Sequence, residues 1–248
     1  MGNLAASPCS NPELTLEDAL NAYRQIGFRK FEAFDSWAAS ALDVTGDPAY
    51  YRNMAGSYEM TFSSMHLPPV EDDLDESVDR AVAACRFAEA IGAPVVLYKA
   101  TSIDNYIRSA GRFLEAIEDI SVTPVLQNHA GSPISTLEDY RRVLDGIDDS
   151  RMQTVLEVGH FHSAGVRWQD GYDLLAGRIA LVHIKDQIGP KPVPFGTGEI
   201  DLRELFDRLW SDGYAGDIVV EMELEEDVLK HYAEGVRYLL DNCKGAAL

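Results

Sequence analysis

Cysteine is scarce in this chain. Only three cysteines occur among 248 residues, at Cys9, Cys85 and Cys243, and no Cys-x-x-Cys pair is present. Single, widely separated cysteines argue against a disulfide framework and against a zinc site built from thiolates. They are typical of proteins from a reducing compartment, so we expect a cytoplasmic location.

Long apolar runs are also missing. No stretch approaches the roughly 20 apolar residues that a helix needs to cross a bilayer. The N-terminus has neither the basic start nor the apolar segment of a secretory signal. The sequence therefore predicts a protein with no membrane partner.

Basic residues are few. Lys and Arg together number 21 against 41 Asp and Glu, which gives a formal net charge of -20. A surface this acidic repels phosphate backbones, and no basic run compensates for it. We therefore expect no nucleic-acid partner, and we interpret the charge as a solvated acidic surface.

The apolar residues that are present fall into short runs, each followed by a stretch with helical periodicity. This unit occurs eight times, and its runs end in polar or charged residues. Strands that alternate with helices form parallel sheets, and eight units in a chain of this length predict one (β/α)₈ barrel, a TIM barrel, over residues 1–248. A doubly wound open sheet is the alternative, although no Gly-x-Gly-x-x-Gly follows the first strand. The predicted strands lie near residues 3–7, 28–34, 58–65, 94–99, 124–126, 154–156, 179–182 and 217–220.

Metal-binding residue types gather where these strands end. Five of the six histidines lie there, together with several acids, whereas His231 falls inside a helix and is interpreted as structural. In a parallel barrel the carboxyl ends of all strands meet on one rim, so these side chains should converge. Imidazole and carboxylate together suit one divalent cation such as Mn²⁺, Mg²⁺, Co²⁺ or Zn²⁺. The rim residues are Glu32, His66, His129, Glu157, His160, His162, His183, Asp186 and Glu221.

Several strings in the sequence resemble one family. LQNHAGS, LEVGHFHSAG, LVHIKD, FGTGEID and GYAGDIVVEME are similar to segments of the xylose-isomerase-like barrel family, and the resemblance covers nearly the whole chain. That family includes sugar-phosphate isomerases and epimerases, inosose dehydratases and the type-two apurinic endonucleases. The resemblance implies a TIM barrel that acts on a small polyhydroxylated carbonyl substrate, and it leaves a homo-oligomer open.

The resemblance also implies a metal site. In the family the ligands are commonly a glutamate, an aspartate, a histidine and a glutamate, which follow strands five to eight. By motif these positions are Gln127, Glu157, His183 and Glu221. Gln127 offers an amide oxygen in place of a carboxylate, so the set carries one negative charge fewer and should bind metal more weakly.

The same substitution affects the chemistry that the resemblance implies. Isomerases and epimerases of the family move a proton beside a metal-polarised carbonyl through an enediolate, with the strand-five and strand-eight glutamates as acid and base. Gln127 cannot accept a proton at neutral pH. Glu221 is then the expected base, with Glu157 and Lys99 as further catalytic residues. A one-base isomerisation or the dehydration of a polyol ketone fits this set better than a two-base epimerisation, unless Glu32 serves as the second base.

Other rim residues are expected to bind substrate. Three of them have an alternative role: His160 would orient Glu157, Lys185 would pair with Asp186, and Trp37 would only pack. The Gly/Pro-rich segment 189–198 is either a lid or a plain connection. The expected substrate-binding residues are Glu32, His66, His129, His160, Lys185 and Trp37.

Two other functions remain as alternatives. Gln127 would also suit a barrel that keeps its sugar pocket but has lost catalysis, because function depends on the site rather than the fold. Cleavage of abasic DNA fits poorly, since the fourth strand ends in Tyr98-Lys99 without a histidine and the chain is strongly acidic.

Overall fold

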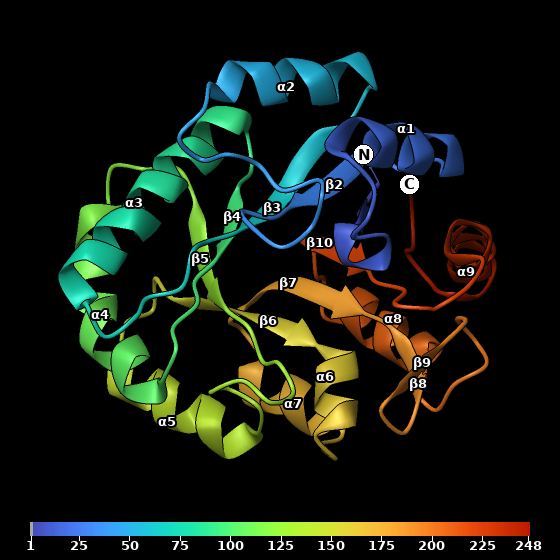
Figure 1. The fold of residues 1–248 in the computed structure, drawn as a ribbon. Coiled ribbons are helices and arrows are strands. Elements are labelled where there is room, and N and C mark those ends of the chain that lie inside the picture. The colour runs from blue at the N-terminus through green and yellow to red at the C-terminus, as the bar shows by residue number, and fades with distance from the viewer. Residues whose placement is uncertain (1) are drawn as a thin grey trace.

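The protein is a closed barrel of eight parallel strands. The computed structural model describes residues 2–248, and the strand order around the barrel is β1-β10-β7-β6-β5-β4-β3-β2 (Figure 1). This confirms the predicted (β/α)₈ barrel. The barrel strands are β1 (Leu4–Ala6), β2 (Lys30–Ala33), β3 (Thr61–His66), β4 (Val95–Leu97), β5 (Thr123–Leu126), β6 (Gln153–Glu157), β7 (Ile179–Ile184) and β10 (Asp217–Val220).

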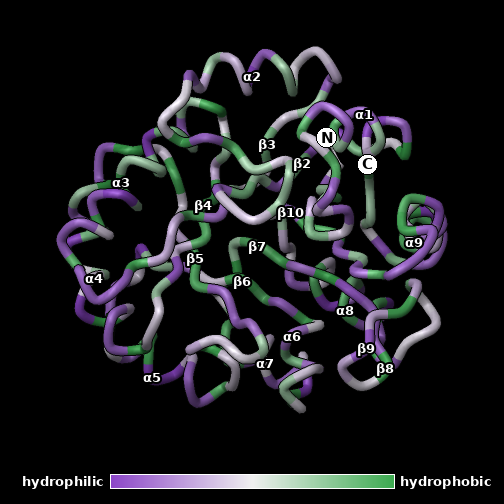
Figure 2. Tube along the Cα trace, in the orientation of Figure 1, coloured by the Kyte–Doolittle hydropathy of each residue, from purple (hydrophilic) through white to green (hydrophobic). Residues whose placement is uncertain are grey.

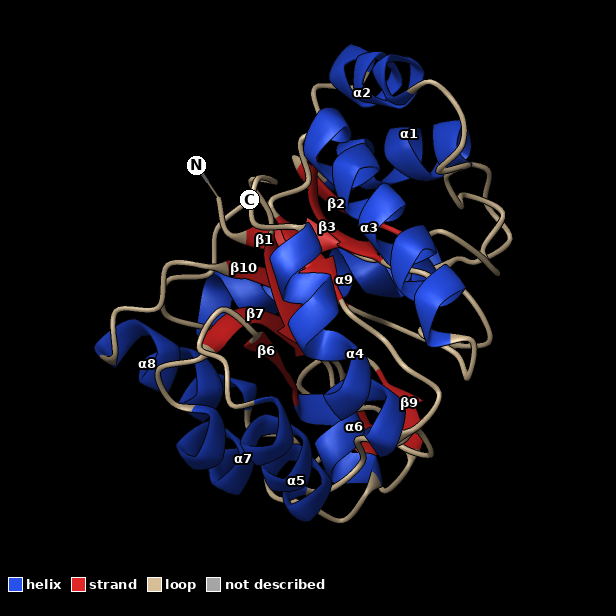
Figure 3. Cartoon of the chain, turned by 90° about the vertical axis from the view of Figure 1, so that its left-hand side faces the viewer, coloured by secondary structure: helices blue, strands red, loops and turns tan. Residues whose placement is uncertain are grey.

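Helices surround the barrel, as the two perpendicular views show (Figures 1 and 3). Hydrophilic and hydrophobic residues alternate along them (Figure 2), as expected for helices that cover a barrel. No helix within residues 2–248 has the length and apolarity to cross a membrane. The helices are the 3-10 turn η1 (Pro8–Ser10), α1 (Leu16–Ile26), α2 (Pro48–Ser57), α3 (Leu74–Ile91), α4 (Ile103–Ala116), α5 (Leu137–Ile147), α6 (Val158–Ser163), α7 (Trp168–Leu175), α8 (Leu202–Ser211) and α9 (Val228–Asn242).

Two layers of apolar side chains form the core. The barrel interior holds six buried residues, one from each of β1, β4, β5, β6, β7 and β10. A larger cluster fills the space between the strands and the helices. The interior layer consists of Ala5, Leu97, Val125, Val155, Leu181 and Val219.

The chain departs from the predicted pattern between the second and third strands. Helix α2 begins at Pro48, after Asp47 accepts a hydrogen bond from the backbone N–H of Ala49. The predicted strand at 58–65 starts only at Thr61, because Tyr58 ends α2 and Glu59 has a φ of 56°. Such a φ is unfavourable for a strand.

The segment after β7 is folded rather than extended. It contains a short antiparallel pair, β8 (Asp186–Ile188) and β9 (Lys191–Val193). The Asp186 carboxylate accepts backbone hydrogen bonds from residues 187, 196, 198 and 200, at 3.0, 2.9, 2.9 and 3.3 Å. A Cβ at Gly198 would lie 2.1 Å from Asp186 Oδ1, so only glycine fits there. Asp186 therefore holds this segment and does not pair with Lys185, the partner considered from the sequence.

Replacing Asp186 tests this arrangement. Asp186→Asn turns an amide N–H₂ toward backbone donors, and we expect it to lower the free energy of unfolding by about 2–3 kcal/mol, the scale of charge-assisted hydrogen bonds. Urea denaturation measures the change. The matched control is Asp145→Asn on the exposed side of α5, which should leave stability unaltered. Equal stability of the two variants would contradict the anchoring role of Asp186.

Candidate functional site

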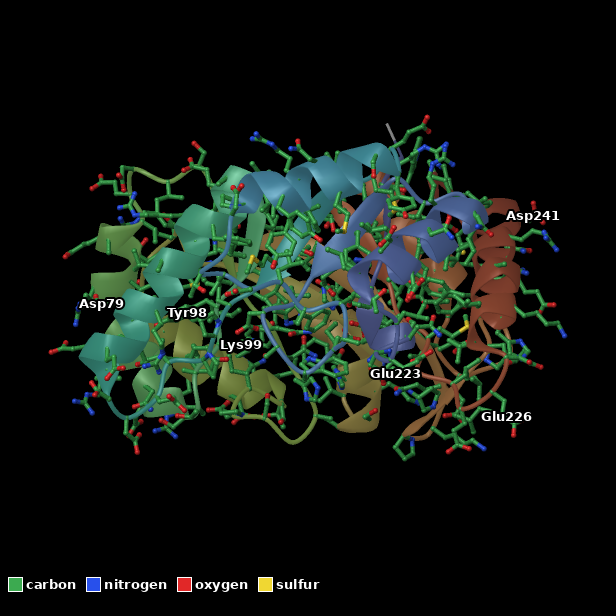
Figure 4. The ribbon with its side chains drawn as sticks, turned by 45° about the horizontal axis from the view of Figure 1, so that its top comes forward. Asp79, Tyr98, Lys99, Glu223, Glu226 and Asp241 are labelled. Carbon is green, nitrogen blue, oxygen red and sulfur yellow. The ribbon has the colours of Figure 1, made fainter. Side chains whose placement is uncertain are left out.

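A cavity of about 360 Å³ opens at the carboxyl ends of the strands. Lys99 and Glu223 lie toward the middle of the view in Figure 4, whereas Asp79 and Asp241 lie at its edges. The lining also includes residues that sequence reasoning missed, namely Cys9, Phe34, Tyr106 and Glu223. The predicted residues that line it are Trp37, His66, Lys99, Gln127, His129, His160 and Glu221.

His183 lies at the centre of the buried part of the site. Its Nδ1 atom lies 3.3 Å from Glu157 Oε2, 3.2 Å from Glu221 Oε1 and 3.4 Å from the amide nitrogen of Gln127. Each residue follows or ends a strand, so the barrel itself brings them together. The four positions that the family resemblance implied therefore meet around one imidazole nitrogen.

Glu157 offers the clearest sign that this cluster suits a cation. Its Oε1 accepts hydrogen bonds from the backbone N–H groups of Gly159 and His160, at 3.0 and 3.4 Å, and so caps α6. Its Oε2 is buried and has no hydrogen-bond partner among residues 2–248. A buried carboxylate oxygen that accepts no aligned hydrogen bond is costly, and a divalent ion would satisfy it. Donor atoms of Glu32, His183 and Glu221 also lie within 4.8 Å of one another.

Glu32 lies on the other side of the His183 ring. Its Oε1 is 3.1 Å from His183 Nε2 and 3.4 Å from His66 Nε2, although neither contact has hydrogen-bond alignment. Hydroxyl groups of Ser7 and Ser64 donate to the carboxylate, at 3.0 and 2.9 Å. Glu32 is fully buried and does not line the cavity.

Lys185 also lies behind the cavity wall. Its side chain is 1% exposed, and Nζ lies 2.7 Å from Glu221 Oε2 and 3.4 Å from Glu223 Oε1. The stem passes closely over Gly159, where a Cβ would lie 2.1 Å from Lys185 Cγ. The glycine of the Gly-His string thus makes room for the lysine that holds Glu221.

Charge governs the protonation of this cluster. Burial disfavours the charged form of His183, but Glu32, Glu157 and Glu221 outweigh it and raise the pKa of the imidazole well above its usual range. Burial likewise opposes ionisation of Glu221, but Lys185 and then His183 lower the pKa of the carboxyl well below its usual range. The cluster therefore holds ionised carboxylates around a positive charge.

The outer part of the cavity carries aromatic and imidazole rings. The rings of His129 and His160 are in contact, with centroids 3.7 Å apart and planes tilted by 38°, and burial lowers the pKa of His160 to about 4. Trp37 is 62% exposed, has a φ of 56° and meets Phe34 edge to face at 5.3 Å. Lys99 Nζ lies 3.7 Å from the carboxylate of Asp35.

His162, by contrast, is directed away from the cavity. Its Nε2 lies 3.1 Å from Glu199 Oε2, which also accepts the backbone N–H of Gly189 at 2.8 Å. His231 lies in α9 beside Glu234, in keeping with its structural interpretation.

The chain belongs to the xylose isomerase-like TIM barrel family. The family model with that description matches residues 20–242. Its relatives and structural neighbours include an inosose dehydratase and an epimerase-like protein. This agrees with the resemblance deduced from the sequence.

Three individual proteins illustrate the relationship. An inosose dehydratase of Bacillus licheniformis is 23% identical over 200 residues. The match covers 64% of this chain and 66% of the dehydratase, so this chain spans just under two thirds of the length of that relative. A D-tagatose 3-epimerase-like protein superimposes with a TM-score of 0.79 at 18% identity, covering 97% of this chain and 98% of its own. The IolI protein with a bound zinc atom gives 0.78 at 14% identity, with coverages of 98% and 100%.

Gly159→Ala tests the contact between α6 and Lys185. The added methyl group displaces a buried side chain, and we expect a loss of about 1–3 kcal/mol in the free energy of unfolding from overpacking. Chemical denaturation measures it. Gly111→Ala in α4 is the matched control, because a Cβ there meets nothing within 4 Å and alanine favours a helix. If Gly159→Ala were as stable as the control variant, the close packing of Lys185 would be disproved.

Proposed function

We propose that this protein is a metal-dependent isomerase or epimerase of a small polyhydroxylated carbonyl compound. The supporting observation is the convergence of Gln127, Glu157 and Glu221 on Nδ1 of His183 beside a cavity of sugar size. These four residues would hold one divalent ion (Mn²⁺, Mg²⁺, Co²⁺ or Zn²⁺). Bound there, the ion would polarise the carbonyl oxygen of a substrate.

Glu221 is the residue that we assign as base. It lines the cavity, and Lys185 together with His183 keeps its carboxylate ionised. An ionised carboxylate can remove a proton from the carbon beside a polarised carbonyl, which gives an enediolate. Gln127 lines the same cavity but has no basic group, so it would contribute only its amide oxygen.

Glu32 has a supporting role in this proposal. Its carboxylate faces Nε2 of His183 and is fixed by two serine hydroxyls. Its negative charge favours a proton on Nε2, so that a metal ion would displace the proton of Nδ1 and bind there. Glu32 would thus position His183 rather than bind substrate.

Dehydration of an inosose is the second candidate. It is favoured by the curated relative in Bacillus licheniformis, which is an inosose dehydratase. Dehydration also begins with removal of a proton beside a carbonyl, so the same base would serve. The product distinguishes the candidates, because dehydration releases water and leaves an unsaturated ketone.

Metal binding gives the most direct test. We expect calorimetry to find one Mn²⁺ per chain, and chelation to lower the melting temperature, because binding to the folded state stabilises it. Glu157→Gln and Glu32→Gln should each weaken binding by about 10–100-fold, the usual effect of losing a ligand or its hydrogen-bonded support. Glu199→Gln, an exposed carboxylate outside the cluster, is the control. Mn²⁺ affinity that is equal in all four proteins would contradict the site.

Gln127→Glu tests whether the glutamine limits the site. The added negative charge should tighten Mn²⁺ binding, because the ligand set then carries three carboxylates. The measurement is the dissociation constant together with turnover of D-tagatose and an inosose. Turnover that appears only in Gln127→Glu would support a sugar-binding barrel that has lost catalysis, and would contradict the proposed enzyme.

A further inference from the structure

The proposed reaction lacks a second proton-transferring group. Epimerisation needs one group that removes a proton and another that returns one to the opposite face of the same carbon. Gln127 cannot do this, so any such group must come from another part of the cavity wall. The remaining ionisable groups at the wall are His66, Lys99, His129, His160 and Glu223, with Tyr106 and Cys9 also present.

His66 has the required position in the barrel. It ends β3, and β3 is three strands away from β10, which carries Glu221 at its end, in the order β10-β1-β2-β3. Gln127 follows β5, which is three strands away in the opposite direction, in the order β10-β7-β6-β5. His66 therefore approaches the cavity from as far around the ring as Gln127 does, but from the other side.

Two opposing effects act on proton transfer at His66, because burial lowers the pKa of its imidazole and the carboxylate of Glu32 raises it. Its Nε2 is fully buried, has no hydrogen-bond partner among residues 2–248 and lies 3.4 Å from the buried carboxylate of Glu32. The ring stacks on Phe34, with centroids 4.0 Å apart, which fixes its plane. The ring lines the cavity. Its other nitrogen, Nδ1, differs from Nε2 in that it is either hydrogen-bonded or exposed. A carboxylate behind an imidazole that faces substrate is the usual arrangement of a histidine acid or base.

The other groups are less suited. Lys99 is paired with Asp35, and the His160 ring packs against the His129 ring. Glu223 follows the same strand as Glu221 and faces Lys185, so it approaches the cavity from the same side as the base.

We propose that His66, stacked on Phe34 and facing the carboxylate of Glu32, is the second proton-transferring residue of this site, which makes the protein a two-base epimerase. This rests on the proposed function. Glu221 removes the proton from the carbon beside the carbonyl, and the electron pair of that C–H bond forms the enediolate. The imidazolium of His66 then delivers its proton to the same carbon from the other face, and the carbonyl re-forms. Product and substrate have the same atoms, and the two residues regain their starting states when Glu221 releases a proton to water and His66 takes one up.

Hydrogen exchange separates the two residues. The Mn²⁺-loaded protein is incubated with D-tagatose, L-ribulose or an inosose in D₂O, and NMR follows both epimer formation and deuterium in recovered substrate. The variants His66→Gln and His66→Asn place an amide near Nε2 and near Nδ1 respectively, and neither amide gains or loses a proton at neutral pH. We expect epimer formation to fall by about 100-fold or more in both. Recovered substrate should still gain deuterium, because Glu221 continues to remove and return protons.

Controls distinguish a role in proton transfer from a structural role. Mn²⁺ affinity and melting temperature should stay unchanged in both His66 variants, and His231→Gln should epimerise as the unmodified protein does. Epimer formation within threefold of the rate of the unmodified protein would overturn the assignment. Loss of Mn²⁺ binding in the His66 variants would also overturn it, because His66 would then act only through His183. If the unmodified protein neither exchanges nor epimerises any of the three compounds, the proposed function fails as well.

Discussion

The arrangement of the site depends on the contact of one buried imidazole with three buried carboxylates. Glu32 and Glu157 are fully buried and Glu221 is 5% exposed, and an unpaired carboxylate is very costly at such depth. His183 lies between them, with Nε2 toward Glu32 and Nδ1 toward the other two. The ammonium group of Lys185 compensates Glu221 from behind. A site assembled in this way suits a dication, because negative oxygens already surround Nδ1 of His183 and a metal ion would take the place of its proton.

The scaffold supports this cluster through backbone contacts. Glu157 ends a strand and caps the next helix with one oxygen, so its other oxygen is directed at His183. Gly159 leaves space for the stem of Lys185, and Asp186 gathers the backbone of the segment that follows. Packing and backbone hydrogen bonds, and not only catalysis, therefore explain why particular residues stand in the strings LEVGHFHSAG, LVHIKD and FGTGEID. The family resemblance therefore reflects packing as much as chemistry.

Much of this could be predicted from the sequence, because a parallel barrel brings the ends of all its strands together. The convergence of Gln127, Glu157 and Glu221 follows from that rule. The depth of each residue does not follow from that rule. Glu32 and Lys185 come at the ends of predicted strands, but their side chains lie behind the cavity wall. The bounds of helix α2 and the β8–β9 pair were not predicted either. Their formation depends on a local cap and on contacts with Asp186, which hydrophobic periodicity does not report.

Anomalous scattering from a crystal soaked in Mn²⁺ would test the central claim most directly. The account predicts a single strong peak on the Nδ1 side of His183, about 2.0–2.3 Å from oxygens of Gln127, Glu157 and Glu221, the range of metal–ligand bonds. A peak on the Nε2 side, a peak between Cys9 and Glu223, or no peak at all would contradict it. With no peak at all, His183 would serve only as a counter-charge for the buried carboxylates.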